Sequence, residues 1–215
     1  MSIPTNFSEE SLADFKFSSN KLVGTERQYS GLRGKLFVPC EGKRFVRIDD
    51  PRAVDSDGLR TPEAHAAAKD LTNVAWLPHL HPDDTLTYGG KGAWLECQNV
   101  GVPKGKALWF RFAFLRFGSL PTNAFATLLA FPDGADPLPP VWIFDVKQLE
   151  EDQFGANQTE WTECVVNDIS ASADFLGTIR WVVGTGHNVA DKQAIPDGTR
   201  FARPGCLLID AIGIS

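Results

Sequence analysis

The stretch Leu108-Trp109-Phe110-Arg111-Phe112-Ala113-Phe114-Leu115 decides the fold class of this chain. Side chains alternate between the two faces of a β-strand, so Leu108 and the three phenylalanines share one face. Trp109, Arg111 and Ala113 share the other face. A strand with one wholly apolar face packs that face against a core, so this stretch predicts a central strand of a layered β-protein.

Eight further segments carry the same apolar or alternating pattern, which predicts about nine strands in all. These segments are residues 35–38, 44–48, 93–97, 124–131, 141–146, 161–166, 178–183 and 206–214. Turn sequences separate several of them, and Pro-Asp-Gly occurs twice, at 132–134 and 196–198. Short strands without alternating helices predict an all-β fold, an antiparallel two-sheet jelly-roll sandwich. The turn between 35–38 and 44–48 predicts that these two strands form a hairpin.

Two regions lie outside this pattern. Residues 1–33 are polar and turn-rich, which predicts an irregular lead-in, and residues 49–92 form a long insertion between strands. Within the insertion, Thr61 stands at an N-cap position, Pro62 follows it and an Ala run comes next, which predicts one short helix over about 61–70. A length of 215 residues favours a single β-sandwich domain over 1–215.

Composition limits the classes of partner. A net charge of −6 and a pI of about 5.2 disfavour nucleic acid, because lysine and arginine supply most of the affinity for phosphates. No run of about 18 apolar residues and no leader peptide occurs, so we expect no membrane span and, by default, a cytoplasmic protein. A particle assembled in the cytoplasm and export without a cleaved leader stay open. The four cysteines form no C-x-x-C pair, and free thiols are favoured over disulfides.

Three segments resemble the galactose-binding-like jelly rolls, the sandwich that many carbohydrate-binding modules share. They are Glu96 to Ala113 with its Pro-x-Gly-Lys turn, the closing strand Leu207 to Ile214, and the opening Asn6-Phe7-Ser8-Glu9-Glu10. The resemblance implies a carbohydrate-binding sandwich. It also implies a structural calcium ion, for which Glu9 or Glu10 and Asp210 stand at the matching positions. The 49–92 insertion departs from the family pattern.

Aromatic residues provide the candidate ligand surface. A pyranose packs its C–H face on an indole while polar groups bind its hydroxyls, so exposed tryptophans near polar side chains favour sugar binding. The candidate ligand-binding residues are Trp76, Tyr88, Trp109, Arg111, Trp142 and His187. For each tryptophan the alternative is a place in the core, and for His187 it is a solvated loop.

His79 and His81, followed by two aspartates, form the one histidine cluster and are a candidate metal site if another element supplies a third ligand. The alternative is a polar loop stiffened by prolines. No nucleophile elbow, zinc-protease motif or phosphate-binding loop occurs, so we identify no catalytic residues and the sequence does not favour an enzyme.

Three functions therefore follow from the sequence in order of support. The first is a non-catalytic carbohydrate-binding protein that binds a glycan through exposed aromatic residues. The second is a structural or assembly protein of a phage or secreted particle, which leaves a homo-oligomer open. The third is a metal- or carboxylate-dependent enzyme that acts on glycans.

Overall fold

The computed structural model of the chain describes residues 7, 12–18, 22–49, 87–89, 93–116, 123–145, 157–188 and 205–215. Its strands are β1 (Phe15–Phe17), β2 (Val23–Glu26), β3 (Tyr29–Ser30), β4 (Leu36–Phe37), β5 (Phe45–Asp49), β6 (Thr87–Gly89), β7 (Ala93–Val102), β8 (Leu108–Arg116), β9 (Asn123–Pro132), β10 (Trp142–Asp145), β11 (Asn157–Gln158), β12 (Thr162–Val166), β13 (Phe175–Asn188) and β14 (Gly205–Ile214). Two short 3₁₀ turns, η1 (Leu32–Gly34) and η4 (Asp168–Ser170), complete the described elements.

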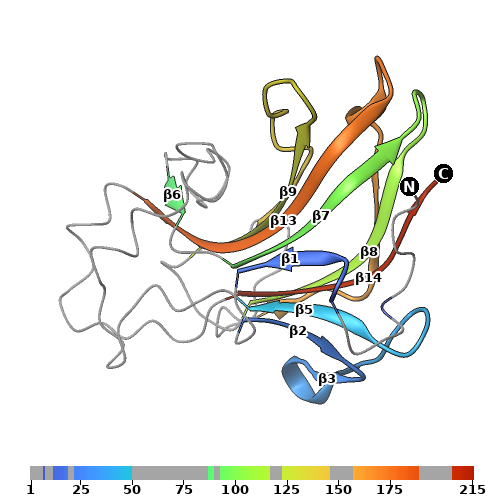
Figure 1. The fold of residues 1–215 in the computed structure, drawn as a ribbon. Helices are drawn as coiled ribbons and strands as arrows, with labels where there is room; N and C mark the ends of the chain where they lie inside the picture. Colours follow the sequence, from blue (N-terminus) through green and yellow to red (C-terminus); the bar gives the residue numbers. More distant parts are fainter. Residues whose placement is uncertain are drawn as a thin grey trace.

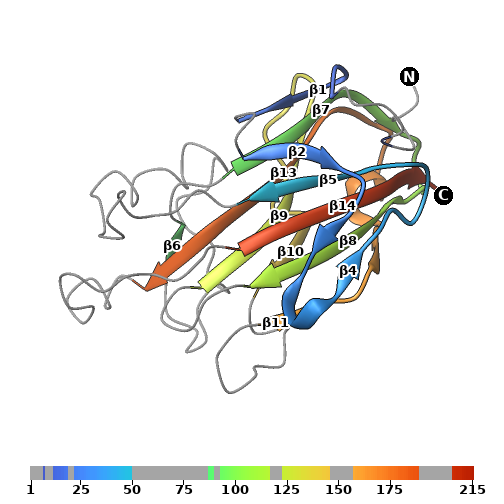
Figure 2. The same ribbon diagram turned by 90° about the horizontal axis from the view of Figure 1, so that it is seen from below.

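Twelve of the described strands form two six-stranded sheets that face one another, and β3 pairs with β4 in a separate two-stranded sheet (Figures 1 and 2). Sheet A has the order β1-β7-β13-β9-β10, and β6 pairs with the end of β13. Sheet B has the order β11-β8-β14-β5-β2, and β12 also pairs with β8. All the pairings in both sheets are antiparallel. The chain is therefore an all-β, antiparallel two-sheet sandwich of jelly-roll type, as the sequence predicts.

The main core fills the space between the sheets and is rich in aromatic rings. Phe110, Phe112 and Phe114 of β8 are at most 3% exposed, which confirms the predicted core face of this strand. The Phe112 ring packs on Trp142 with centroids 4.8 Å apart, and Phe110 packs edge-on against the fully buried Trp181 at 5.7 Å. Such edge-to-face contacts hold the two sheets at a defined spacing.

A second, smaller core lies on the outer face of sheet B, beneath the hairpin β3–β4. We call residues 29–37 the arm. Buried apolar side chains of the arm, β5, β8 and β14 form this core, namely Phe37, Phe45, Ala113, Leu115, Cys206 and Leu208. The Trp161 ring packs edge-on against Phe37 and Phe45, with centroid distances of 5.8 and 5.5 Å.

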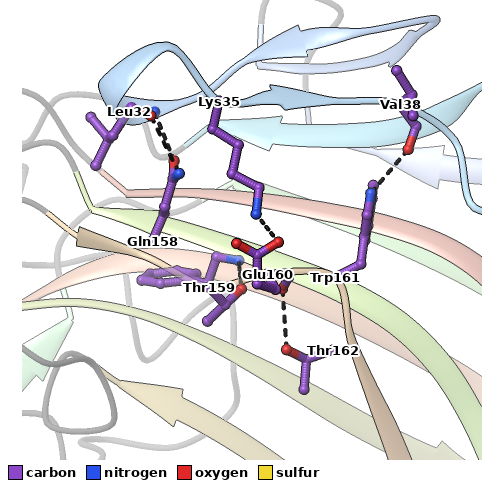
Figure 3. Close-up of polar contacts among 9 residues, drawn as sticks. Leu32, Lys35, Val38, Gln158, Thr159, Glu160, Trp161 and Thr162 are labelled. Carbon is purple, nitrogen blue, oxygen red and sulfur yellow. Dashed lines mark hydrogen bonds and ion pairs between the residues drawn. The ribbon is translucent and has the colours of Figure 1, made fainter.

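Polar contacts tie the arm to residues 158–162, which run beneath it (Figure 3). The Leu32 backbone N–H donates to Gln158 Oε1 at 2.7 Å, and Trp161 Nε1 donates to the Val38 carbonyl at 2.9 Å. Lys35 forms an ion pair with Glu160. These contacts come from within the arm and from Val38 directly after it, so the arm covers one end of the outer face of sheet B.

Two expectations about the N-terminal part are wrong. The region 1–33 is not irregular throughout, because β1 joins the edge of sheet A, β2 joins the edge of sheet B and β3 pairs with β4. The segments 35–38 and 44–48 do not form a hairpin, because β4 pairs with β3 whereas β5 lies between β2 and β14. Local pattern shows which side chains share a face, but it does not show which strand lies alongside.

The remaining local expectations fall partly outside the described residues. The predicted helix at 61–70 lies outside them, and within the 49–92 insertion the residues described are Asp49 and those of β6. Across the described ranges, no helix combines the length and the apolar character needed to cross a bilayer.

Candidate functional site

The outer face of sheet A carries a row of aromatic and charged side chains on three neighbouring strands. The long strands of this sheet bend, and the outer face lies on the inside of the bend (Figure 1). Trp94 and Glu96 belong to β7, Arg180 to β13 and Phe131 to β9. Their sequence neighbours Leu95, Ile179 and Ala130 are buried in the main core, so alternation directs these four side chains away from it.

Glu96 and Arg180 form the centre of this row. They are register partners on β7 and β13, and Arg180 donates to Glu96 Oε2 from Nε at 2.9 Å and from Nη2 at 2.6 Å. Gln98 Nε2 donates to the other carboxylate oxygen of Glu96 at 3.0 Å. The Glu96 side chain is 7% exposed and that of Arg180 is 22% exposed. Both oxygens of the buried carboxylate therefore have donors, and the guanidinium is held in one position.

Two aromatic rings flank this guanidinium. Arg180 Cζ lies 5.0 Å from the ring centroid of Trp94 and 5.0 Å from that of Phe131. Each ring is a diagonal cross-strand neighbour of Arg180, a position within reach of aromatic side chains. Both rings are half-buried. We call Trp94, Glu96, Gln98, Phe131 and Arg180 the aromatic row, and it spans about 10 Å across the sheet.

The predicted residues Trp109 and Arg111 lie on the opposite side of the sandwich. Both point from β8 to the outer face of sheet B, as alternation predicts, and both are half-buried. Trp142, in contrast, packs against Phe110 and Phe112 at the edge of the main core, with its ring centroid 5.2 and 4.8 Å from theirs. The three predicted residues therefore do not share one surface.

The other predicted site residues lie at or beyond the limit of the described chain. Tyr88 and His187 are register partners where β6 pairs with β13, so the backbone brings these two positions together. Trp76, Glu9, Glu10, His79 and His81 lie outside the described residues. The metal site at His79 and His81 remains a prediction, as does an enzyme that uses it. The structural or assembly function also remains a prediction.

Asp210 is fully buried on β14, and the donors around it are backbone N–H groups. Cys40 and Glu41 donate to Oδ2 at 2.5 and 3.1 Å, and the Ala211 N–H donates to Oδ1 at 2.9 Å. Burial raises the pKa of this carboxyl, and the three N–H groups oppose that shift. Asp210 thus anchors the segment after the arm to sheet B.

The surroundings of Asp210 do not fit the calcium ion that the family resemblance implies. Calcium takes six to eight oxygen ligands. The N–H groups already occupy both carboxylate oxygens of Asp210, and no group of three or more His, Cys, Asp or Glu able to hold a metal occurs within the described ranges. Since Glu9 lies outside these ranges, the calcium site remains a prediction and enters no step below.

The aromatic row was not predicted from the sequence. The alternating pattern around Trp94 and Arg180 puts both side chains on the solvent face of their strands, and this pattern could have marked them as candidates. Trp94, however, is 86 positions from Arg180 in the chain, and only the pairing register brings them together.

The comparisons concern the fold of the chain. No protein-family model matches it, and neither does any curated protein. Solved structures similar to it include carbohydrate-binding modules of the β-sandwich type, the group that its sequence resembles. A family 61 module in complex with β-1,4-galactotriose is 12% identical, with 98% of this chain and 94% of that chain covered and a TM-score of 0.43.

Two further modules are comparable. A family 28 module specific for non-crystalline cellulose is 8% identical, with a coverage of 100% of this chain and 94% of that chain and a TM-score of 0.47. A family 27 module of Caldicellulosiruptor saccharolyticus, in complex with mannohexaose, is 9% identical, with 97% and 93% covered and a TM-score of 0.43.

Proposed function

We propose that this chain binds carbohydrate on the outer face of sheet A, at the aromatic row. The observation that carries this proposal is the Arg180 guanidinium, held by Glu96 between the half-buried rings of Trp94 and Phe131. A sugar ring offers an apolar C–H face and a rim of hydroxyls, so its binding site needs aromatic surface and polar groups side by side. The aromatic row supplies both on one face.

Each member of the row has a distinct role in this proposal. Trp94 and Phe131 provide the apolar surface on which a pyranose packs. The exposed amide of Gln98 and the exposed ammonium of Lys16, which is in register with Glu96 on β1, supply hydrogen bonds to hydroxyls at one border. Glu96 is a positioning residue, because it holds Arg180 but is itself too buried to meet a polymer.

Preorganisation favours binding at this place. A free arginine side chain loses rotamer entropy when a ligand immobilises it, and that loss subtracts from affinity. Here the two hydrogen bonds to Glu96 and the two ring contacts already immobilise the guanidinium before any ligand arrives. The entropic loss on binding is correspondingly smaller.

Calorimetric titration tests this proposal with galactotriose, mannohexaose, xylan fragments and soluble cellulose fragments as probes. Substitution Trp94→Ala should weaken binding of the best probe by roughly tenfold, which corresponds to about 1.4 kcal/mol. The control is Val38→Ser, because Val38 is 50% exposed and lies on the sheet B side. Failure of the wild-type protein to bind every probe, or equal affinities for wild type and Trp94→Ala, would refute the proposal.

A further inference from the structure

Trp109 packs against the backbone of sheet B. Its register partners are Gly213 on β14 and Val165 on β12. A Cβ atom built on Gly213 would lie 2.7 Å from each of three neighbouring indole atoms, Cε2, Cζ2 and Nε1. These three atoms follow one another along the edge of the indole that carries the N–H, so this edge lies against Gly213. Because glycine has no side chain, the ring can approach the backbone this closely.

The Trp109 side chain is half-buried, so part of the indole is exposed to solvent.

Polar and apolar groups border this ring. Arg111 lies two residues along the same face of β8, with its Nε 3.9 Å from Glu163 Oε2, and their side chains are 40% and 54% exposed. Val165 is 50% exposed beside the ring. The patch thus combines a flat aromatic surface, one apolar edge and an exposed pair of opposite charges.

The arm leaves this end of sheet B uncovered. Its second core buries Ala113 and Leu115, farther along the same face of β8. Trp109 and Arg111, on the same face, remain partly exposed. On this face of β8, the protein covers Ala113 and Leu115 with its own residues, whereas Trp109 and Arg111 are partly exposed to solvent.

We infer that Trp109, Arg111, Glu163 and Val165 form a second carbohydrate-binding site, for a single neutral pyranose stacked on the indole. The exposed part of the indole packs on the C–H groups of the sugar, while Arg111 and Glu163 bind its hydroxyls. The charges of Arg111 and Glu163 cancel, so the site recognises a neutral and not an anionic sugar. A purely apolar ligand would leave these exposed polar groups without partners.

This second site goes beyond the proposed function, because it gives one molecule two sugar-binding faces. The aromatic row lies on the outer face of sheet A and the Trp109 patch on the outer face of sheet B, so a stretch of glycan on one face does not meet the other. Two such sites raise avidity on a dense glycan surface and allow one protein molecule to bridge two chains.

Indole N–H signals in ¹⁵N NMR spectra test the inference on the intact chain. Single Trp→Phe variants at the other five tryptophans assign their indole signals, and the remaining signal is then that of Trp109. Mannohexaose, galactotriose and soluble cellulose fragments are the probes. We expect the Trp109 signal to shift on titration both in the wild type and in Trp94→Ala, and Arg111→Ala to weaken the Trp109 response at least fivefold. Because the signal is read in the wild type, the test does not depend on the folding of a Trp109 variant.

The outcomes separate the two proposals. A Trp94 response without any Trp109 response would overturn the second site and leave the proposed function intact. A Trp109 response alone would refute the aromatic row and support the second site. If neither signal responds to any probe, both proposals fail. A Trp109 signal that shifts with protein concentration and not with sugar would overturn the inference, because it would identify a protein interface.

Discussion

Replacing Arg180 by methionine should destabilise the fold through Glu96. Methionine keeps most of the side-chain length, but it removes both N–H donors from a carboxylate that is 7% exposed. Breaking a buried ion pair by removing one partner costs about 3–5 kcal/mol, because the other charge is left without compensation. Since Arg180 is 22% exposed and Gln98 still donates to Glu96, we expect the lower end of this range, about 3 kcal/mol.

The double variant Arg180→Met/Glu96→Gln isolates the pair. With both charges absent, no buried carboxylate remains unpaired, so part of the lost stability should return. A coupling free energy of roughly 2 kcal/mol is expected from the double-mutant cycle. Urea denaturation of the four proteins, followed by tryptophan fluorescence and circular dichroism, measures each free energy of unfolding.

Arg111→Met is the matched control. Its ion pair with Glu163 is longer, at 3.9 Å, and both side chains are more exposed, so the loss should be under about 1 kcal/mol. Two results would contradict the argument. One is a cost of Arg180→Met no greater than that of Arg111→Met, and the other is a double variant whose loss equals the sum of the two single losses.

Three further predictions concern the rest of the fold. A thiol reagent should label Cys40 alone in the folded protein and all four cysteines in urea. The other three cysteines are buried, and burial raises the pKa of the Cys97 thiol to about 11. Fast labelling of a second thiol in the folded protein would contradict this. The pKa of the Asp210 carboxyl is raised in the folded protein, so the folded state binds the carboxyl proton more tightly than the unfolded state does. The stability advantage of the wild type over Asp210→Asn should therefore fall as pH rises from about 3.8 through the raised pKa. Urea denaturation in acid and at neutral pH measures this advantage, and an advantage that rises with pH would refute the prediction. Phe37→Ala should lower the free energy of unfolding by about 3–5 kcal/mol and speed amide hydrogen exchange in the arm, because the ring is 1% exposed in the second core. An unchanged exchange rate in the arm would mean that Phe37 does not hold it.

The sequence by itself determined the fold class and the side-chain faces of the long strands. Alternation is a local property with a period of two, so it assigned Phe110, Phe112 and Phe114 to the core, and Trp109 and Arg111 to the outer face. All of these assignments match the structure. The antiparallel sandwich followed from the number of strands and their turns, which also require no knowledge of distant contacts.

Only the tertiary structure decided which strands are neighbours, and with that the candidate sites. Trp142 has the same local pattern as an exposed tryptophan, but its strand β10 places it against the core rings of β8. Glu96 and Arg180 are 84 positions apart, and the register of β7 with β13 makes them partners. Pairing is set by the total packing of both sheets, and a shift of one residue would turn every side chain to the other face. No segment of the sequence carries that information alone.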